Sequence, residues 1–251
     1  YDFLFRTDHW VSSDAEQDTA SYPLLWLDGM ELDGQDHTGA TFHVVCLGQL
    51  DGVEHEDGLE AALQSARKQG ALTVLAHPHW CSNTVQDCLR WSFDGVEIYN
   101  HVCRWINGKS GGLVHWDAAL MRRPATLGFA ADDAHLRPEH PGWNGGWIMV
   151  NTAECTRANI MEAIRRGNYY SSCGPHLESI TYDGESVHVE TSPVQFARLV
   201  GPNGQGERAG TFEGKPFETA TLPVPDNWEY AYLEVEDEQG RRAWTNALFT
   251  G

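Results

Sequence analysis

The sequence predicts a mainly parallel α/β fold followed by a small antiparallel β-sandwich, and two patterns carry this prediction. Over residues 1–177, short apolar runs alternate with amphipathic, helix-like segments, as in proteins whose parallel strands are joined by helices. Over residues 178–251, helical periodicity disappears, and short alternating segments are separated by turn dipeptides. We therefore expect two domains, residues 1–177 and residues 178–251.

Seven strands are expected in the first region. Each is a short run of apolar and β-branched residues bounded by polar or glycine-containing segments. They are residues 2–6, 24–32, 40–47, 72–76, 95–99, 126–130 and 147–151.

Two segments between these strands have the periodicity of amphipathic helices. Apolar residues three and four positions apart share one face of a helix. The first segment carries Leu59, Ala62, Leu63 and Ala66 at this spacing, and the second carries Ile160, Ala163 and Ile164. We expect Asp57 and Glu60 to form a capping box at the start of the first helix, and Gly70 to end it.

The second region is expected to form short strands joined by tight turns. Its alternating segments occupy residues 186–190, 194–200, 229–235 and 243–249. Dipeptides that favour turns separate them, namely Asp183-Gly184, Asn203-Gly204, Glu213-Gly214 and Gln239-Gly240.

The composition restricts the partners and the location of the protein. With 17 basic and 36 acidic residues the net charge is −19, which disfavours nucleic acid and anionic membranes as partners because like charges repel. No apolar run approaches the roughly 18–20 residues that span a bilayer. The six cysteines lack a C-x-x-C pair, so we expect them in buried packing roles and the protein in the cytoplasm.

Histidine, carboxylate or asparagine residues follow the apolar runs of five of the predicted strands. These segments are Asp8-His9, Asp28 to Glu31, His77 to His79, Asn100-His101 and Asp132 to His135. In α/β barrels the carboxyl ends of the strands meet on one rim, so these side chains are expected in one pocket. Such a set suits zinc, manganese or iron, and a cation offsets the repulsion between carboxylates. Alternatively, each residue is separately a cap, a turn residue or a hydrogen-bonded core group.

In this order, the motifs resemble the PHP (polymerase and histidinol phosphatase) superfamily. The resemblance covers about residues 1–177, and the stretch from Trp116 to Pro175 resembles the CehA/McbA metallohydrolase branch, related to carbaryl hydrolase. The motifs are Thr7-Asp8-His9, the strand-end Glu31, Ala76-His77-Pro78, Gly95 to Asn100 and Asp133-Ala134-His135. The resemblance implies a distorted seven-stranded barrel that holds two or three divalent metal ions.

The resemblance also implies roles for individual residues. His9 and His135 would share one metal, and Glu31 would bridge two others, with Asp133 on one of these. His77 would bind the second, together with His43, although a strand histidine such as His43 is equally expected in core packing.

Three further residues are expected close to the metals. Asn100 and His101 would touch substrate or metal, and His79 would support the ligands from outside. His135 or His101 would transfer protons while metal-bound hydroxide attacks the substrate.

One departure from the family pattern concerns the start of the chain. The family has a His-x-His motif some 25 to 30 residues before Thr-Asp-His, whereas Tyr1 precedes His9 by only eight residues. Those two histidines would complete the first metal site, because zinc takes about four ligands. We expect the motif and its strand in residues upstream of Tyr1, and a degenerate family member is the alternative.

The function expected from these features is metal-dependent hydrolysis of phosphoester, carbamate or related ester bonds in a small molecule. The alternative is a degenerate, non-catalytic PHP-like protein that binds a ligand. The sequence leaves the substrate, the metal and the oligomeric state open.

Overall fold

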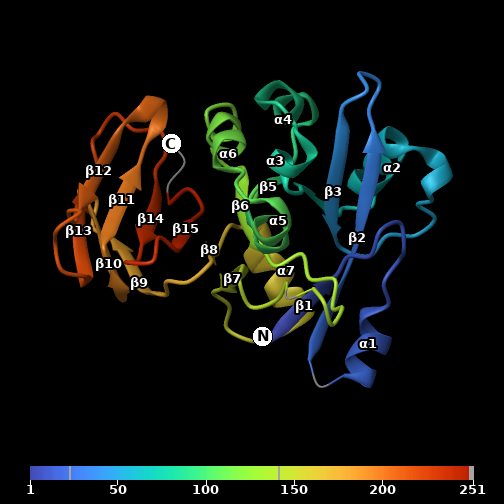
Figure 1. Cartoon of the computed structure of the whole chain (residues 1–251), viewed down its shortest axis with the longest axis horizontal. Coiled ribbons are helices and arrows are strands. Elements are labelled where there is room, and N and C mark those ends of the chain that lie inside the picture. The colour runs from blue at the N-terminus through green and yellow to red at the C-terminus, as the bar shows by residue number, and fades with distance from the viewer. Residues whose placement is uncertain (23, 141, 249–251) are drawn as a thin grey trace.

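The computed structural model describes residues 1–22, 24–140 and 142–248, and in its first part helices alternate with strands as predicted (Figure 1). The elements there are β1 (Phe3–Arg6), α1 (Ala15–Ser21), β2 (Leu25–Gln35), β3 (Thr41–Leu47), α2 (Leu59–Lys68), β4 (Leu72–Leu75), α3 (Pro78–Cys81), α4 (Val85–Trp91), β5 (Gly95–Asn100), α5 (His101–Asn107), α6 (Leu113–Leu120), β6 (Leu127–Ala131), β7 (Trp147–Val150), α7 (Arg157–Arg165) and β8 (Tyr169–Ser172). The predicted strands of this region correspond to β1–β7, with ends that shift by a few residues. Strand β8 was not predicted.

One strand of the first sheet runs against all the others. The sheet order is β1-β2-β3-β4-β5-β6; β1 and β2 are parallel, as are β4, β5 and β6, whereas β3 is antiparallel to both of its neighbours. Only residues 36–40 join β2 to β3, which is too short for a parallel crossover. As a result, the start of β3 lies at the edge of the sheet where its neighbours end.

The sheet does not close into the seven-stranded barrel that the family resemblance implies. Within the described residues it has six strands, and β7 pairs instead with β8, which pairs with β15 (Arg242–Thr245) of the following region. The link between β6 and β8 is a side chain: Ser171 Oγ accepts from Ala130 N and donates to Gly128 O, both at 2.9 Å. The Ser171 hydroxyl thus connects β6 and β8 at a place where a closed barrel would have backbone hydrogen bonds between strands.

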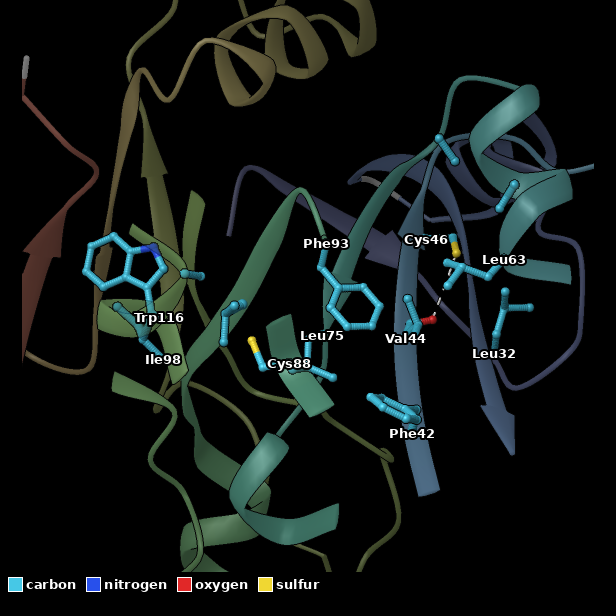
Figure 2. Packing of buried hydrophobic residues seen from close by; sticks show 14 of the residues in the cluster. Leu32, Phe42, Val44, Cys46, Leu63, Leu75, Cys88, Phe93, Ile98 and Trp116 are labelled. Atoms are coloured by element: carbon cyan, nitrogen blue, oxygen red, sulfur yellow. Dashed lines mark hydrogen bonds between the residues drawn. The ribbon is translucent and has the colours of Figure 1, made fainter. Parts of the chain in front are cut away.

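Side chains cover both faces of the six-stranded sheet because they alternate along each strand. The apolar residues on one face form a cluster that we call the outer-face cluster, which packs against α2, α4 and α6. Figure 2 shows three of its members, Leu32, Cys46 and Leu63, gathered between β2, β3 and α2. The inner-face cluster packs against α7 and comprises Leu27, Leu47, Leu72, Val74, Leu127, Phe129, Ile160, Ile164 and Tyr169. Some residues of β2 and β3 belong to neither cluster, and these form part of the site described below.

The two predicted amphipathic helices are present as α2 and α7, and their predicted apolar faces are buried. The start of α2 differs from the prediction: its N-cap is Gly58, and Asp57 instead belongs to a capping box with Glu54 in the preceding turn. Gly70 follows the end of α2 with a φ of +82°, a conformation that glycine adopts without strain. No helix in the described residues is long and apolar enough to cross a membrane.

The second part of the chain forms antiparallel sheets. Its strands are β9 (Leu177–Tyr182), β10 (Ser186–Val194), β11 (Phe196–Val200), β12 (Gly206–Ala209), β13 (Phe217–Pro223), β14 (Tyr232–Glu236) and β15. One sheet has the order β13-β10-β9, the other has the order β12-β11-β14-β15-β8-β7, and both contribute to one buried cluster. Of the predicted segment 243–249, residue 249 lies outside the described residues. The boundary at residue 177 stays a prediction, since the larger sheet extends across it.

Aromatic side chains join the second part to the first. The Tyr232 ring lies 4.6 Å from Trp116, and its hydroxyl donates to Asp117 at 3.0 Å. Trp244 stacks on Tyr99, the residue before Asn100, with ring centres 6.4 Å apart. These contacts bury Trp116, Tyr232 and Trp244 in the outer-face cluster.

We expect Asn246→Ala to lower the free energy of unfolding by about 2–4 kcal/mol, measured by urea denaturation, because it leaves buried backbone groups without partners. Asn246 Oδ1 accepts from Gly128 N at 2.9 Å, and its Nδ2 donates to the carbonyl oxygens of Gly167 and Tyr169 at 3.2 Å. Asn168→Ala is the control, because that side chain is exposed and has no hydrogen bond in the described structure. Equal stability of the two variants would contradict this role.

Candidate metal centre

A buried carboxylate, Glu31 of β2, lies among three imidazoles. Its Oε1 is 2.6 Å from His43 Nδ1 and 3.5 Å from His77 Nε2, and its Oε2 is 3.8 Å from His9 Nε2. Glu31 is 6% exposed and His77 is 5% exposed, whereas His9 faces solvent. The three histidines come from three different places in the sequence.

The strand arrangement explains how these residues meet. His9 follows β1 and pairs with Glu31 in an isolated parallel bridge. His43 lies near the start of β3, which the reversed direction of that strand brings to the same edge of the sheet. Ala76 donates its N–H to His43 O at 3.0 Å, which places the next residue, His77, beside them. The residues that meet here are therefore not all at strand ends: His43 lies near a strand beginning, and Glu31, expected at a strand end, lies within β2.

The donor set fits a divalent metal ion. Ligand atoms of His9, Glu31 and His43 all lie within 4.8 Å of one another. Imidazole nitrogen and carboxylate oxygen are the ligands that zinc and other first-row transition metals take in proteins. In this grouping His43 contacts Glu31 directly, which favours the site role over core packing.

Asp33 orients His9 and was not recognised in the sequence. Asp33 Oδ1 lies 2.8 Å from His9 Nδ1, so the carboxylate holds the ring with Nε2 directed to Glu31. Carboxylates commonly fix metal-binding histidines in this way. The signal was available: Asp33 is two residues after Glu31 in one strand, and period-two alternation puts both on one face.

A second polar group lies next to His77 and contains Glu97, Asn100 and Asp133. Glu97 Oε2 accepts from His77 N at 2.8 Å and from Asn100 Nδ2 at 3.0 Å. Asn100 Nδ2 is also 3.3 Å from Asp133 Oδ2. Glu97 was not predicted as a site residue, although a glutamate inside the otherwise apolar and uncharged segment 95–99 is a signal for one.

Two residues of the site have left-handed backbone conformations. The φ of His77 is +27° and that of Asp133 is +56°. Such conformations cost about 1–3 kcal/mol in residues other than glycine and tend to occur at functional sites. Surrounding hydrogen bonds must therefore hold both residues in place.

The site roles expected for His135, His101 and His79 stay predictions. His135 is exposed, and its Nδ1 is 2.9 Å from the carbonyl oxygen of Asp133. His101 is partly buried, with Nδ1 3.2 Å from the Tyr99 hydroxyl, and His79 is exposed. His9 contacts Glu31 and Asp33, so the pairing of His9 with His135 on one metal stays a prediction.

Burial and mutual contacts shift the pKa values of the central groups. Burial raises the pKa of a carboxyl group, but hydrogen bonds from His43 and His77 outweigh this and lower the pKa of Glu31 to about 2. Burial lowers the pKa of an imidazole, but contacts with Cys81 and Glu31 and the charge of Glu97 raise the pKa of His77 to about 11.

Two neighbouring carboxyl groups shift the other way. Burial raises the pKa of Glu97 to about 7 despite the charge of His77. Burial also raises the pKa of Asp133. The buried carboxyl groups of the site are therefore ionised only where a protonated imidazole or another cation offsets their charge. A divalent metal ion would supply such a positive charge.

Comparison with known proteins gives a likeness of fold. No protein-family model and no curated protein matches the sequence. The structure is similar to a crystal structure from Bacteroides vulgatus ATCC 8482, a two-domain protein containing a predicted PHP-like metal-dependent phosphoesterase. The TM-score is 0.53 at 14% sequence identity, over 98% of this chain and 86% of the other. The two proteins thus share a mixed α/β fold with antiparallel sheets.

We expect His43→Ala and Glu31→Gln each to weaken binding of Zn²⁺ by about 10-fold or more, measured by competition with a chromophoric chelator, because each removes one donor of the central group. His37→Ala is the control: His37 also contacts a glutamate, Glu60, at 2.7 Å, but on the surface. Equal affinity of all three variants would contradict the assignment of the centre.

Metal affinity should rise with pH, because a metal ligand must be deprotonated. Below its raised pKa of about 11 His77 carries a proton, which a bound metal ion has to displace. Each proton released on binding strengthens the apparent affinity by up to about tenfold per pH unit. Titration calorimetry with Mn²⁺ at about pH 6.5 and 8.5 measures this, and an affinity independent of pH would contradict the protonation of the site.

Proposed function

We propose that this chain is a metal-dependent hydrolase of phosphoester, carbamate or related ester bonds in a small molecule. The observation that carries the proposal is the buried carboxylate of Glu31 with three imidazoles around it. The fold of the two-domain protein with a predicted PHP-like phosphoesterase supports the same class of reaction. The motif order supports the finer assignment to the CehA/McbA branch.

The residues that would hold metal are His9, Glu31 and His43, with His77 beside them and Asp133 on the far side of Asn100. We infer two or three divalent ions, of zinc, manganese or iron, since the imidazole and carboxylate donors suit all of these. When bound, such ions polarise the scissile group and lower the pKa of water towards about 7.

His135 is suited to transfer a proton. Its Nδ1 faces the carbonyl oxygen of Asp133 at 2.9 Å, and a carbonyl only accepts, so Nδ1 carries the hydrogen. In the neutral ring Nε2 is then the acceptor. The side chain is 43% exposed, so a substrate in solution can reach it.

His101 is the second candidate for proton transfer. The Tyr99 hydroxyl lies 3.2 Å from His101 Nδ1 and also accepts from Arg104 Nη1 at 3.4 Å. In the tautomer whose Nδ1 accepts from the Tyr99 hydroxyl, Nε2 carries the ring hydrogen. In this tautomer His101 would serve as a proton donor.

Trp80 borders the metal centre. Its ring contacts His43 and His77 edge to face, with ring centres 5.5 Å and 5.2 Å apart, and it is 37% exposed. An indole in this place shields the imidazoles from water on one side, which strengthens electrostatic interactions within the site.

The second candidate function is ligand binding without catalysis. In the described residues, His9, Glu31 and His43 are the one group of three metal-binding side chains whose ligand atoms all lie within 4.8 Å of one another. A single ion with three protein ligands would bind an anionic or carbonyl-containing ligand, yet it would lack the second ion of a two-metal mechanism.

We expect the metal-loaded protein to hydrolyse at least one of p-nitrophenyl phosphate, bis(p-nitrophenyl) phosphate, p-nitrophenyl acetate and an aryl carbamate, followed by release of the chromophore. Glu31→Gln should lower kcat/KM about 100-fold or more, because the central donor is lost. Glu60→Gln, which alters a surface carboxylate that also contacts a histidine, should keep wild-type activity. Metal-dependent binding of these compounds without turnover would favour the ligand-binding protein.

A further inference from the structure

Glu97 is a buried carboxylate in the middle of a buried strand. Every residue of β5 is buried, and Glu97 is 5% exposed. Removing a carboxylate from water costs several kcal/mol unless hydrogen bonds compensate. Its hydrogen-bond donors in the described structure are the His77 backbone N–H and the Asn100 side-chain amide, both of which belong to the metal centre.

A β-bulge allows Glu97 and Asn100 to face the same side. In a regular strand, residues three positions apart point to opposite faces. Here the pairing with β6 passes from Glu97 opposite Phe129 to Tyr99 opposite Ala130, so Ile98 is an extra residue. Ile98 and Tyr99, although consecutive, both pack in the outer-face cluster. The bulge thus turns Asn100 to the face that carries Glu97.

One oxygen of Glu97 connects the two halves of the site. Oε2 accepts from His77 N at 2.8 Å and from Asn100 Nδ2 at 3.0 Å, and the same Nδ2 lies 3.3 Å from Asp133 Oδ2. His77 and Asp133 are the two site residues with left-handed backbone conformations. These hydrogen bonds act on the residues that most need an external constraint.

We propose that Glu97 is a positioning residue that holds His77 directly, and Asp133 through Asn100, in the geometry that binds metal. This inference rests on the proposed function, since it presupposes the metal centre. It assigns to Glu97 the role of a hydrogen-bond acceptor and not that of a metal ligand. The bulge in β5 contributes to this positioning, because without it the Asn100 side chain would point away from Glu97.

The test compares Glu97→Gln with Glu97→Leu. A glutamine carbonyl oxygen in the place of Oε2 accepts both hydrogen bonds, whereas leucine has a similar size and accepts none. Zn²⁺ and Mn²⁺ affinities are measured by chelator competition, with thermal unfolding of the metal-free variants alongside. We expect Glu97→Gln to remain within about threefold of wild type and Glu97→Leu to lose about 10- to 100-fold. Glu234→Leu is the control, because Glu234 is a buried strand glutamate of β14 whose hydrogen bonds go to Arg198 and Trp244 and not to the metal centre, and it should keep wild-type affinity.

Two other results of these affinity measurements would overturn the positioning role of Glu97. Glu97→Gln as weak as Glu97→Leu would show that the charge or a ligand oxygen matters, and would overturn the proposed role. Wild-type affinity of Glu97→Leu would overturn it as well. Should the leucine variant fail to fold, Glu97→Gln decides alone: wild-type affinity supports the role, and a loss of about tenfold or more overturns it. Absence of metal binding by the wild-type protein would overturn the proposed function itself.

Discussion

The burial of several carboxylates in one place is the constraint on which the centre of this molecule depends. Glu31 and Glu97 are withdrawn from water, and no lysine or arginine forms an ion pair with either in the described structure. Burial without compensation would force both to take up protons. Imidazoles from three segments surround Glu31, and a backbone N–H and an amide serve Glu97. The order and direction of the strands place these partners next to the two carboxylates.

Irregular backbone features coincide with this centre. The reversed direction of β3 brings His43 to the edge where its neighbours end, and the bulge in β5 turns Asn100 inward. His77 and Asp133 have positive φ values in turns that follow β4 and β6. Elsewhere the sheet alternates regularly between the inner-face and outer-face clusters. Residues held in uncommon backbone conformations tend to occur at functional sites, and His77 and Asp133 fit that tendency.

Much of this arrangement could be predicted from the sequence, and the rest depends on tertiary pairing. Apolar runs and helical periodicity located β1–β7, α2 and α7, because burial imposes those periods. Strand-end histidines and carboxylates located most of the candidate site. The direction of β3 and the pairing of β8 with β15 were missed, because apolar patterns do not specify a partner strand. The charge of Glu97 within an apolar strand marks it in the sequence, but its role could not be predicted because a local pattern does not show that a bulge gives Glu97 and Asn100 a common face.

The sheet that contains β7, β8 and β15 also affects how the chain can be divided. Cutting after residue 177 would leave β8 as an exposed edge strand, with unpaired N–H and C=O groups where β15 now binds. The same cut would uncover the faces of Trp116 and Tyr99 that Tyr232 and Trp244 now cover. Open edges and bare aromatic surfaces promote self-association. A chain shortened at this position would therefore be more prone to self-association than the full chain.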